Sequence, residues 1–169
     1  MVRVITVDNH GFLYLVARSE WMAKDPVDCT MVTRPFNRVV LTVTRTQECN
    51  NRTDCINQLR MLQDKHMDEG QTDIKPSFLI GGYGTVYEGR GWKCLTAFEP
   101  GEQRGRLEIS FIGDFATNSS ILRPPPYEMF ASALTLIKHG LKNDFISQDY
   151  KLSYFMHNPF PENVKVFNI

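Results

Sequence analysis

Residues Phe78–Trp92 read F-L-I-G-G-Y-G-T-V-Y-E-G-R-G-W, and this stretch decides how the rest of the chain is interpreted. Its apolar beginning, Phe78-Leu-Ile80, consists of strand-forming residues, and an alternating strand pattern follows at Thr85-Val-Tyr-Glu88. Between them, Gly82-Tyr83-Gly84 supplies the positive-φ positions of a tight reversal. The stretch therefore predicts a β-hairpin.

The G-x-G pattern in this turn is also found in nucleotide-binding loops. Those glycines open a helix whose N-terminal amides hold the phosphates. Here the following residues are β-branched and alternating, so the sequence argues against a phosphate-binding loop.

Length and charge limit the possible function classes. A chain of 169 residues with 42% hydrophobic residues is sufficient for one compact domain with a single core. Lys and Arg number 19 and Asp and Glu also number 19, so the chain lacks the positive charge that a nucleic-acid partner requires. No apolar run is long enough to span a membrane, and the first residues do not resemble a signal peptide.

The remaining sequence predicts strands around the hairpin. Val2–Val7 and Phe12–Val16 flank a turn and read as two short strands, the first of which is an added edge strand or a tail. Ala23–Pro35 reads as an extended connection, and Val39–Val43 as a central strand buried on both faces. Leu152–Phe155 is expected to end the sheet.

Two helices are predicted. The first covers Asp54–Met67, with Thr53 as its N-cap and Gly70 beyond its end. The second begins after Pro124-Pro-Pro126 and has an apolar stripe that stops at Gly140.

Four cysteines and two sequons indicate an oxidising compartment. A zinc pair at Cys49 and Cys55 is disfavoured because no second C-x-x-C or H-x-x-x-H supplies the remaining ligands. The sequence leaves the pairing of Cys29 and Cys94 open. Asn51 and Asn118 are the glycosylation candidates. We expect any signal or membrane anchor to lie outside these residues.

The hairpin stretch resembles the signature of the peptidoglycan recognition proteins, a family related to phage-type zinc amidases. The resemblance extends to other segments in the family's order: Val16–Trp21 resembles its first strand, Cys49–Cys55 its cysteine loop, Ile109–Phe115 its I-S-F-I-G-N-F strand and Asp149–Leu152 its last core strand. It implies an α/β fold with a central mixed β-sheet flanked by helices, the amidase-like peptidoglycan recognition domain, at residues 16–169. Residues 1–15 are then an N-terminal extension or edge strands. The resemblance also implies a disulfide between Cys49 and Cys55.

Active members of this family are amidases that hold a zinc with two histidines and a cysteine, beside a tyrosine. The matching positions here are Val43, Phe155, Asn163 and, for the tyrosine, Pro76. A catalytic zinc needs about three protein ligands. The resemblance therefore implies a degenerate site with no metal, no cofactor and no amidase activity.

A non-catalytic member can still bind peptidoglycan. His66 matches a histidine that contacts the peptidoglycan stem peptide in the family, and Arg104 and Arg106 are placed to hold a carboxylate. Other expected groove positions differ from the family pattern. The ligand-binding candidates are therefore His66, Gly70, Gln71, Phe98, Gln103, Arg104 and Arg106.

The resemblance implies an innate immune receptor or regulator that works through protein association. We expect a co-receptor or decoy whose partner is another peptidoglycan recognition protein, in a hetero- or homodimer, with or without bound muropeptide. The alternative is a pattern recognition receptor that binds muropeptide directly without cleaving it. Either would be extracellular, as a secreted protein or as the ectodomain of a membrane receptor.

Overall fold

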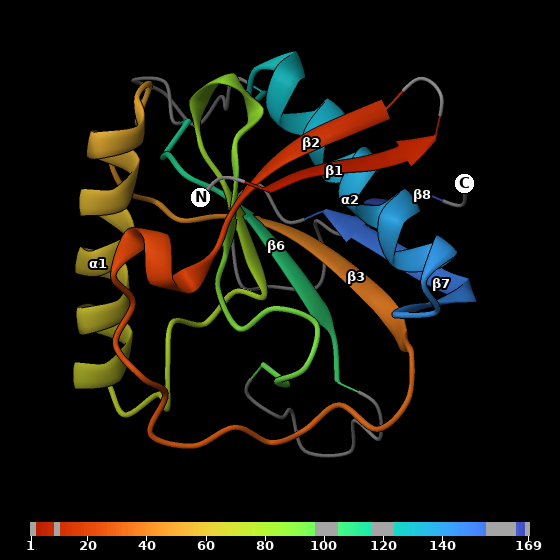
Figure 1. Ribbon diagram of the computed structural model, residues 1–169, viewed down its shortest axis with the longest axis horizontal. Helices are drawn as coiled ribbons and strands as arrows, with labels where there is room; N and C mark the ends of the chain where they lie inside the picture. The colour runs from red at the N-terminus through yellow and green to blue at the C-terminus, as the bar shows by residue number, and fades with distance from the viewer. Residues whose placement is uncertain (1–2, 9–10, 97–104, 116–123, 155–164, 168–169) are drawn as a thin grey trace.

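The computed structural model describes residues 3–8, 11–96, 105–115, 124–154 and 165–167. Within these residues, eight strands form one sheet in the order β1-β2-β5-β4-β6-β3-β7-β8, with both parallel and antiparallel pairs. Figure 1 shows α1 at the left of the strands and α2 at the upper right, across the other part of the sheet. This confirms the expected fold class, a central mixed sheet flanked by helices.

The predicted hairpin is present. Strands β4 (Phe78–Ile80) and β5 (Val86–Glu88) pair in antiparallel fashion. In the turn between them, Tyr83 and Gly84 have positive φ angles of 63° and 81°. The expectation that Gly82 also has a positive φ was wrong. Gly82 is required by space instead, because a Cβ there would lie 2.4 Å from the carbonyl oxygen of Cys49.

Parallel strands form the middle of the sheet. Strand β3 (Phe36–Val43) lies between β6 (Leu107–Phe111) and β7 (Ile146–Tyr154) and is parallel to both, and β4 is also parallel to β6. Val39, Val40 and Leu41 are at most 5% exposed, which confirms the prediction of a strand buried on both faces. The carboxyl ends of these four parallel strands therefore meet at one edge of the sheet.

Helix α1 (Arg52–Asp68) begins two residues earlier than predicted. Its N-cap is Asn51, whose side-chain oxygen accepts a hydrogen bond of 2.9 Å from the backbone nitrogen of Asp54. The assignment of Thr53 as the cap was wrong, because the asparagine two residues earlier satisfies a free amide of the first turn. Gly70 follows the helix with a φ of 92°, as expected of a residue beyond a helix end.

Helix α2 (Tyr127–Lys142) begins after the prolines as predicted but continues past Gly140. The apolar stripe does end there, since the buried residues of the helix run from Met129 to Gly140. A Cβ at Gly140 would lie 2.6 Å from the side chain of Ile146 and 2.8 Å from the ring of Trp92. The glycine is therefore required by packing inside the helix.

The two helices cover opposite faces of the sheet. We call these faces the α2 side and the α1 side, and alternate residues of β4 divide between them. On the α2 side, buried residues of the helix pack against every second strand residue, among them Leu41, Phe78, Ile80, Ile109, Phe111, Met129, Ala133, Leu136 and Ile137. The α1 side has a smaller cluster that includes Leu59, Leu62, Leu79, Tyr87 and Ile112.

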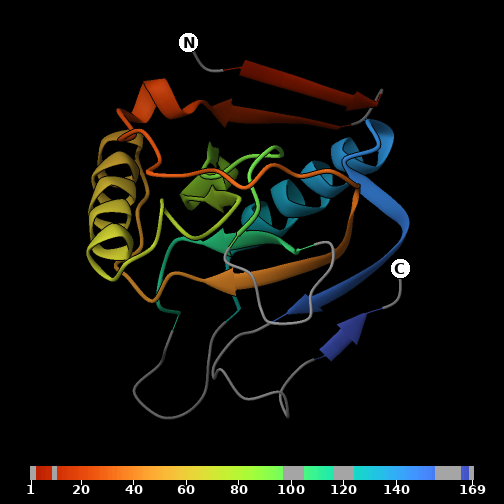
Figure 2. The ribbon, with the colours of Figure 1, turned by 90° about the horizontal axis from the view of Figure 1, so that it is seen from below.

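The N-terminal residues form a two-stranded ribbon along one margin of the molecule, as Figure 2 shows. Strands β1 (Arg3–Asp8) and β2 (Gly11–Val16) are antiparallel, as predicted, and β2 joins the sheet beside β5. After Val16 the chain does not continue as a strand. It turns into the 3-10 helix η1 (Arg18–Trp21), because buried Trp21 donates a 2.8 Å hydrogen bond from Nε1 to the carbonyl of Glu88.

At the other margin, β8 (Lys165–Phe167) pairs in antiparallel fashion with β7. The expectation that Leu152–Phe155 ends the sheet was therefore wrong, because Lys165–Phe167 forms one more strand beyond β7.

Candidate functional site

The end of helix α1 presents a neutral histidine. The Nδ1 atom of half-buried His66 accepts a 3.0 Å hydrogen bond from the backbone nitrogen of Lys75. Burial, and after it the positive charge of Lys75, lowers the pKa of His66 to about 4. At neutral pH the ring is uncharged, and because Nδ1 is an acceptor, the proton lies on Nε2. Nε2 is then a hydrogen-bond donor.

The turn after α1 brings two further candidates to this histidine. Exposed Gly70 adopts its positive φ, and the backbone nitrogen of Gln71 donates a 2.9 Å hydrogen bond to the carbonyl of His66. The structure therefore groups His66, Gly70 and Gln71 in one turn.

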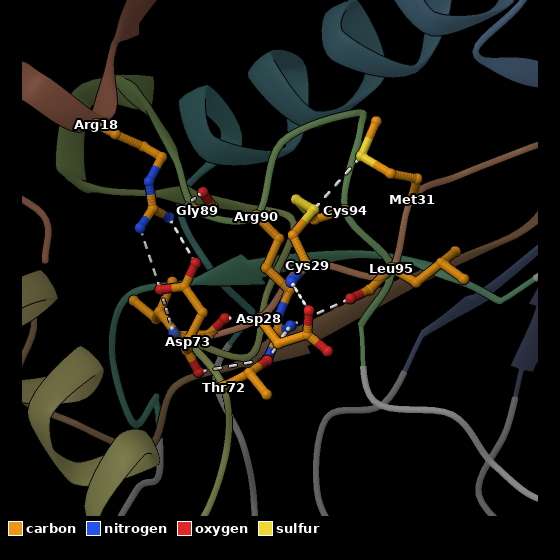
Figure 3. The surroundings of a disulfide bond; sticks show 11 residues. Arg18, Asp28, Cys29, Met31, Thr72, Asp73, Gly89, Arg90, Cys94 and Leu95 are labelled. Carbon is orange, nitrogen blue, oxygen red and sulfur yellow. Dashed lines mark hydrogen bonds and ion pairs between the residues drawn. A yellow bond between two sulfur atoms is a disulfide. The ribbon is translucent and has the colours of Figure 1, made fainter. Parts of the chain in front are cut away.

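A buried arginine fixes the segment that contacts His66. Arg90 is only 7% exposed, and its guanidinium donates to the carbonyls of Ile74 (2.9 Å), Leu95 (3.2 Å) and Asp73 (3.4 Å). It also donates to the hydroxyl of Thr72 at 3.1 Å. Figure 3 shows Arg90 reaching this segment from the hairpin, beside the Cys29–Cys94 disulfide. The backbone that precedes Lys75 is thus held by one side chain.

An ion pair fixes the same segment from the other side. Nη1 of Arg18 lies 2.8 Å from Oδ2 of Asp73, whose side chain is 4% exposed. Oδ1 of Asp73 accepts from Nε2 of Gln63 on α1 at 2.8 Å. These contacts connect η1, α1 and the segment before β4. Figure 3 shows the contact between Arg18 and Asp73. The sequence analysis did not identify Arg18, Asp73 or Arg90, because their partners lie far away in the chain.

Of the remaining ligand-binding candidates, the structure describes Arg106, which lies outside the turn that groups His66, Gly70 and Gln71. Half-buried Arg106 precedes β6, and its carbonyl accepts a 3.1 Å hydrogen bond from the hydroxyl of Thr96. Phe98, Gln103 and Arg104 lie outside the described residues.

Two of the four positions that match the zinc site of the family are described. Val43 is partly buried and packs against the core on the α2 side. Pro76 is buried, and its carbonyl accepts a 3.0 Å hydrogen bond from the backbone nitrogen of Arg90. Neither residue offers a metal ligand. Phe155 and Asn163 lie outside the described residues.

The polar groups on the other face of the same strands were missed. Thr42 precedes Val43 and points to the α1 side, where its hydroxyl donates a 3.1 Å hydrogen bond to Oε1 of Glu108 on β6. The alternation of side chains along a strand was the available signal, because Leu41 and Val43 both pack on the α2 side.

The described residues do not fit a catalytic zinc of the two-histidine, one-cysteine type. The chain has four cysteines, and all of them are in the Cys29–Cys94 and Cys49–Cys55 disulfides. No thiolate is therefore available as a ligand. His66 lies on α1 and His139 on α2, on opposite sides of the sheet. The described part of the chain contains no group of three His, Cys, Asp or Glu side chains that could hold a metal ion.

The Cys49–Cys55 disulfide that the resemblance implied is present at the start of α1, and the hairpin packs against it. A Cβ at Gly81 would lie 2.6 Å from the sulfur of Cys55, so the hairpin backbone packs directly on the disulfide. Exposed Asn51 lies in this loop, and its Nδ2 contacts Oδ2 of Asp54 at 2.6 Å. Asn118, the other glycosylation candidate, lies outside the described residues.

None of the helices in the described ranges has the length and apolar character needed to cross a membrane. The two disulfides are consistent with an extracellular location.

Comparison with known proteins gives the chain clear relatives, although no protein-family profile matches it. It is 35% identical over 139 residues to peptidoglycan-recognition protein 1 of Holotrichia diomphalia, covering 82% of this chain and 68% of the relative. One similar solved structure is tracheal cytotoxin bound to the ectodomain complex of peptidoglycan recognition proteins LCa and LCx, with a TM-score of 0.73, 33% identity and coverage of 83% and 82%. Another is peptidoglycan recognition protein LE in complex with tracheal cytotoxin, a monomeric diaminopimelic acid-type peptidoglycan. It has a TM-score of 0.74, 34% identity and coverage of 82% and 79%.

Proposed function

Because the chain belongs to the peptidoglycan recognition protein family, we propose that it is a non-catalytic recognition domain of an innate immune receptor or regulator. It acts as a co-receptor or decoy by associating with a ligand-binding relative. The observation that supports the lack of catalysis is the pairing of all four cysteines in disulfides. This pairing removes the thiolate that the family's zinc site requires.

The proposed partner is another peptidoglycan recognition protein. Support comes from the LCa–LCx structure, in which two family ectodomains form a complex with tracheal cytotoxin bound. In this proposal residues 16–169 are the recognition domain, residues 1–15 are an N-terminal addition, and the protein is secreted or is the ectodomain of a membrane receptor.

A second candidate function is direct binding of muropeptide without cleavage. The observation that favours it is the Nε2–H donor of neutral His66, which the Lys75 backbone holds in one tautomer. The LE protein, at 34% identity, is a relative that binds a monomeric muropeptide. In this alternative the ligand-binding residues are His66, Gly70, Gln71 and Arg106 together with Phe98, Gln103 and Arg104.

Calorimetric titration with monomeric diaminopimelic acid-type muropeptide tests the two functions. The domain is titrated alone and then in a mixture with a ligand-binding relative. A co-receptor or decoy gives no heat alone but associates with the relative in a ligand-dependent way. Micromolar binding by the domain alone, reduced by His66→Ala and unchanged by the surface control Arg60→Ala, would instead support direct recognition.

The absence of catalysis is tested separately. The purified domain, supplied with one equivalent of zinc, is incubated with muropeptide, and an active amidase of the family serves as the positive control. We expect no release of the stem peptide and no tight stoichiometric zinc. Zinc-dependent cleavage would overturn the proposal.

A further inference from the structure

Strand β1 is a terminal strand of the sheet, and one of its edges faces away from the molecule. Within the described residues it pairs only with β2. Figure 2 shows β1 along the outer margin, with the rest of the described chain on its β2 side. Its outer edge therefore presents backbone N–H and C=O groups that another strand can pair with.

The sequence of β1 favours such pairing. It reads R-V-I-T-V-D, with β-branched residues in the interior and charges only at the ends. Ile5 packs against the core, so the strand is anchored in the sheet. A proline and an internal charge are two features that keep edge strands from pairing, and β1 has neither. A bulge is a third, and the register shift between Thr6 and Asp8 limits the regular edge of β1 to Arg3–Thr6.

The outward face of the β1–β2 ribbon is apolar as well. Val4 is 58% exposed, Phe12 59% and Tyr14 48%. Val4 lies directly opposite Tyr14 in the ladder, and the rings of Phe12 and Tyr14 are 5.6 Å apart in an edge-to-face arrangement. A partner that extends the sheet at β1 would lie next to this exposed surface.

We propose that the outer edge of β1 pairs with β1 of a second copy of this chain, in antiparallel orientation about a two-fold axis. The opposite charges at the two ends of β1, Arg3 and Asp8, favour a second copy of this chain as the partner. An antiparallel pair brings the Arg3 end of one copy to the Asp8 end of the other, twice by symmetry, whereas a parallel pair would place like charges together. The two sheets then form one continuous sheet, and the β1 edge of each copy is closed.

The register follows from the regular part of the strand. The pairing of β1 with β2 is regular from Arg3 to Thr6 and shifts between Thr6 and Asp8. A two-fold axis at Ile5 places Ile5 opposite its copy and Val4 opposite Thr6, with the same faces of both sheets aligned. Arg3 of each copy then lies toward the Asp8 end of the other strand.

The dimer is weak, because pairing two six-residue strand edges buries less surface than the roughly 1,200 Å² that stable interfaces bury. This inference does not depend on the proposed function, since it requires neither muropeptide nor a relative. If an experiment refutes the dimer, the proposed function is therefore unaffected, and the reverse also holds.

Sedimentation equilibrium of the 169-residue chain tests the proposal over about a hundredfold range of concentration, because mass action sets the dimer fraction. We expect the mean mass to rise from monomer toward dimer and no further. Arg3→Glu and Asp8→Arg should each raise the dissociation constant about tenfold, since each places like charges together twice. The double variant R3E/D8R should restore the original constant to within about threefold.

Arg60→Glu on the exposed surface of α1 is the matched control and should leave the dimer unchanged. Amide hydrogen exchange provides a second readout, in which protection of the outward-facing amides of β1 rises with concentration. A monomer over the whole range, growth beyond dimers, or a double variant that restores nothing would each overturn the proposal.

Discussion

Replacing Arg90 with methionine should strongly destabilise the domain. Arg90 is 7% exposed and satisfies three backbone carbonyls, those of Asp73, Ile74 and Leu95, and one hydroxyl. Methionine fills similar space but donates no hydrogen bond. The three carbonyls then remain buried without this donor.

The magnitude follows from the number of lost contacts. Each buried acceptor that loses its donor costs about 1 to 3 kcal/mol, and hydrogen bonds from a charged group are at the stronger end. Some relaxation and the apolar contacts of methionine offset part of the loss. We expect Arg90→Met to lower the free energy of unfolding by about 3 to 5 kcal/mol. Arg90→Lys keeps the charge but cannot reach all the acceptors, so its effect should be intermediate.

Urea denaturation with the disulfides intact measures this change, with Arg60→Met on the exposed surface of α1 as the matched control. The control should change the unfolding free energy by less than about 0.5 kcal/mol. A loss below about 1 kcal/mol for Arg90→Met would refute the reasoning, because it would mean that the carbonyls find other donors at little cost. In the folded variant, ¹⁵N shifts of His66 should move toward a mixture of tautomers, because Lys75 is less firmly placed.

Three further predictions concern the hairpin, the disulfides and the histidine. Gly81→Ala places a methyl group 2.6 Å from a disulfide sulfur and should cost about 1 to 3 kcal/mol in thermal unfolding, whereas no loss would mean that the hairpin moves freely. Replacing the Cys29–Cys94 pair with serines should cost about 4 kcal/mol and replacing the Cys49–Cys55 pair about 2 kcal/mol, because the closed loops span 65 and 6 residues. The reverse order in urea denaturation would contradict this entropic account. His66 has a pKa lowered from 6.5 to about 4, so the unfolded chain binds its proton first, and the stability it contributes is complete above pH 6.5 and is lost as the pH falls toward 4. His66→Asn keeps an acceptor for the Lys75 amide but does not titrate, so its unfolding free energy should fall less over this range, and an unchanged pH dependence would contradict the assignment.

The sequence predicted the fold well where the signal was local. The two strands of the hairpin, the apolar stripe of α2 and the continuous run of β3 depend on residues that are close in the chain, and the structure has all three. The errors were at the ends of elements. Asn51 rather than Thr53 caps α1, because capping geometry decides where the helix begins.

The candidate site was predicted only in part. The sequence placed His66 near the end of α1 with Gly70 and Gln71 beside it, and the structure groups them in one turn. It gave no indication that Arg90 and Asp73 fix the neighbouring segment, since their contacts join residues up to 55 positions apart, as between Arg18 and Asp73.

The sequence by itself determined the family and the mixed sheet, because these depend on which residues stand at which positions. Only the tertiary structure decided that Cys29 pairs with Cys94, which faces of the sheet Thr42 and Val43 point to, and which nitrogen of His66 keeps its proton. Each of these depends on a contact between segments distant in the chain. Such contacts form when burial of the core brings the segments together, so local sequence patterns do not predict them.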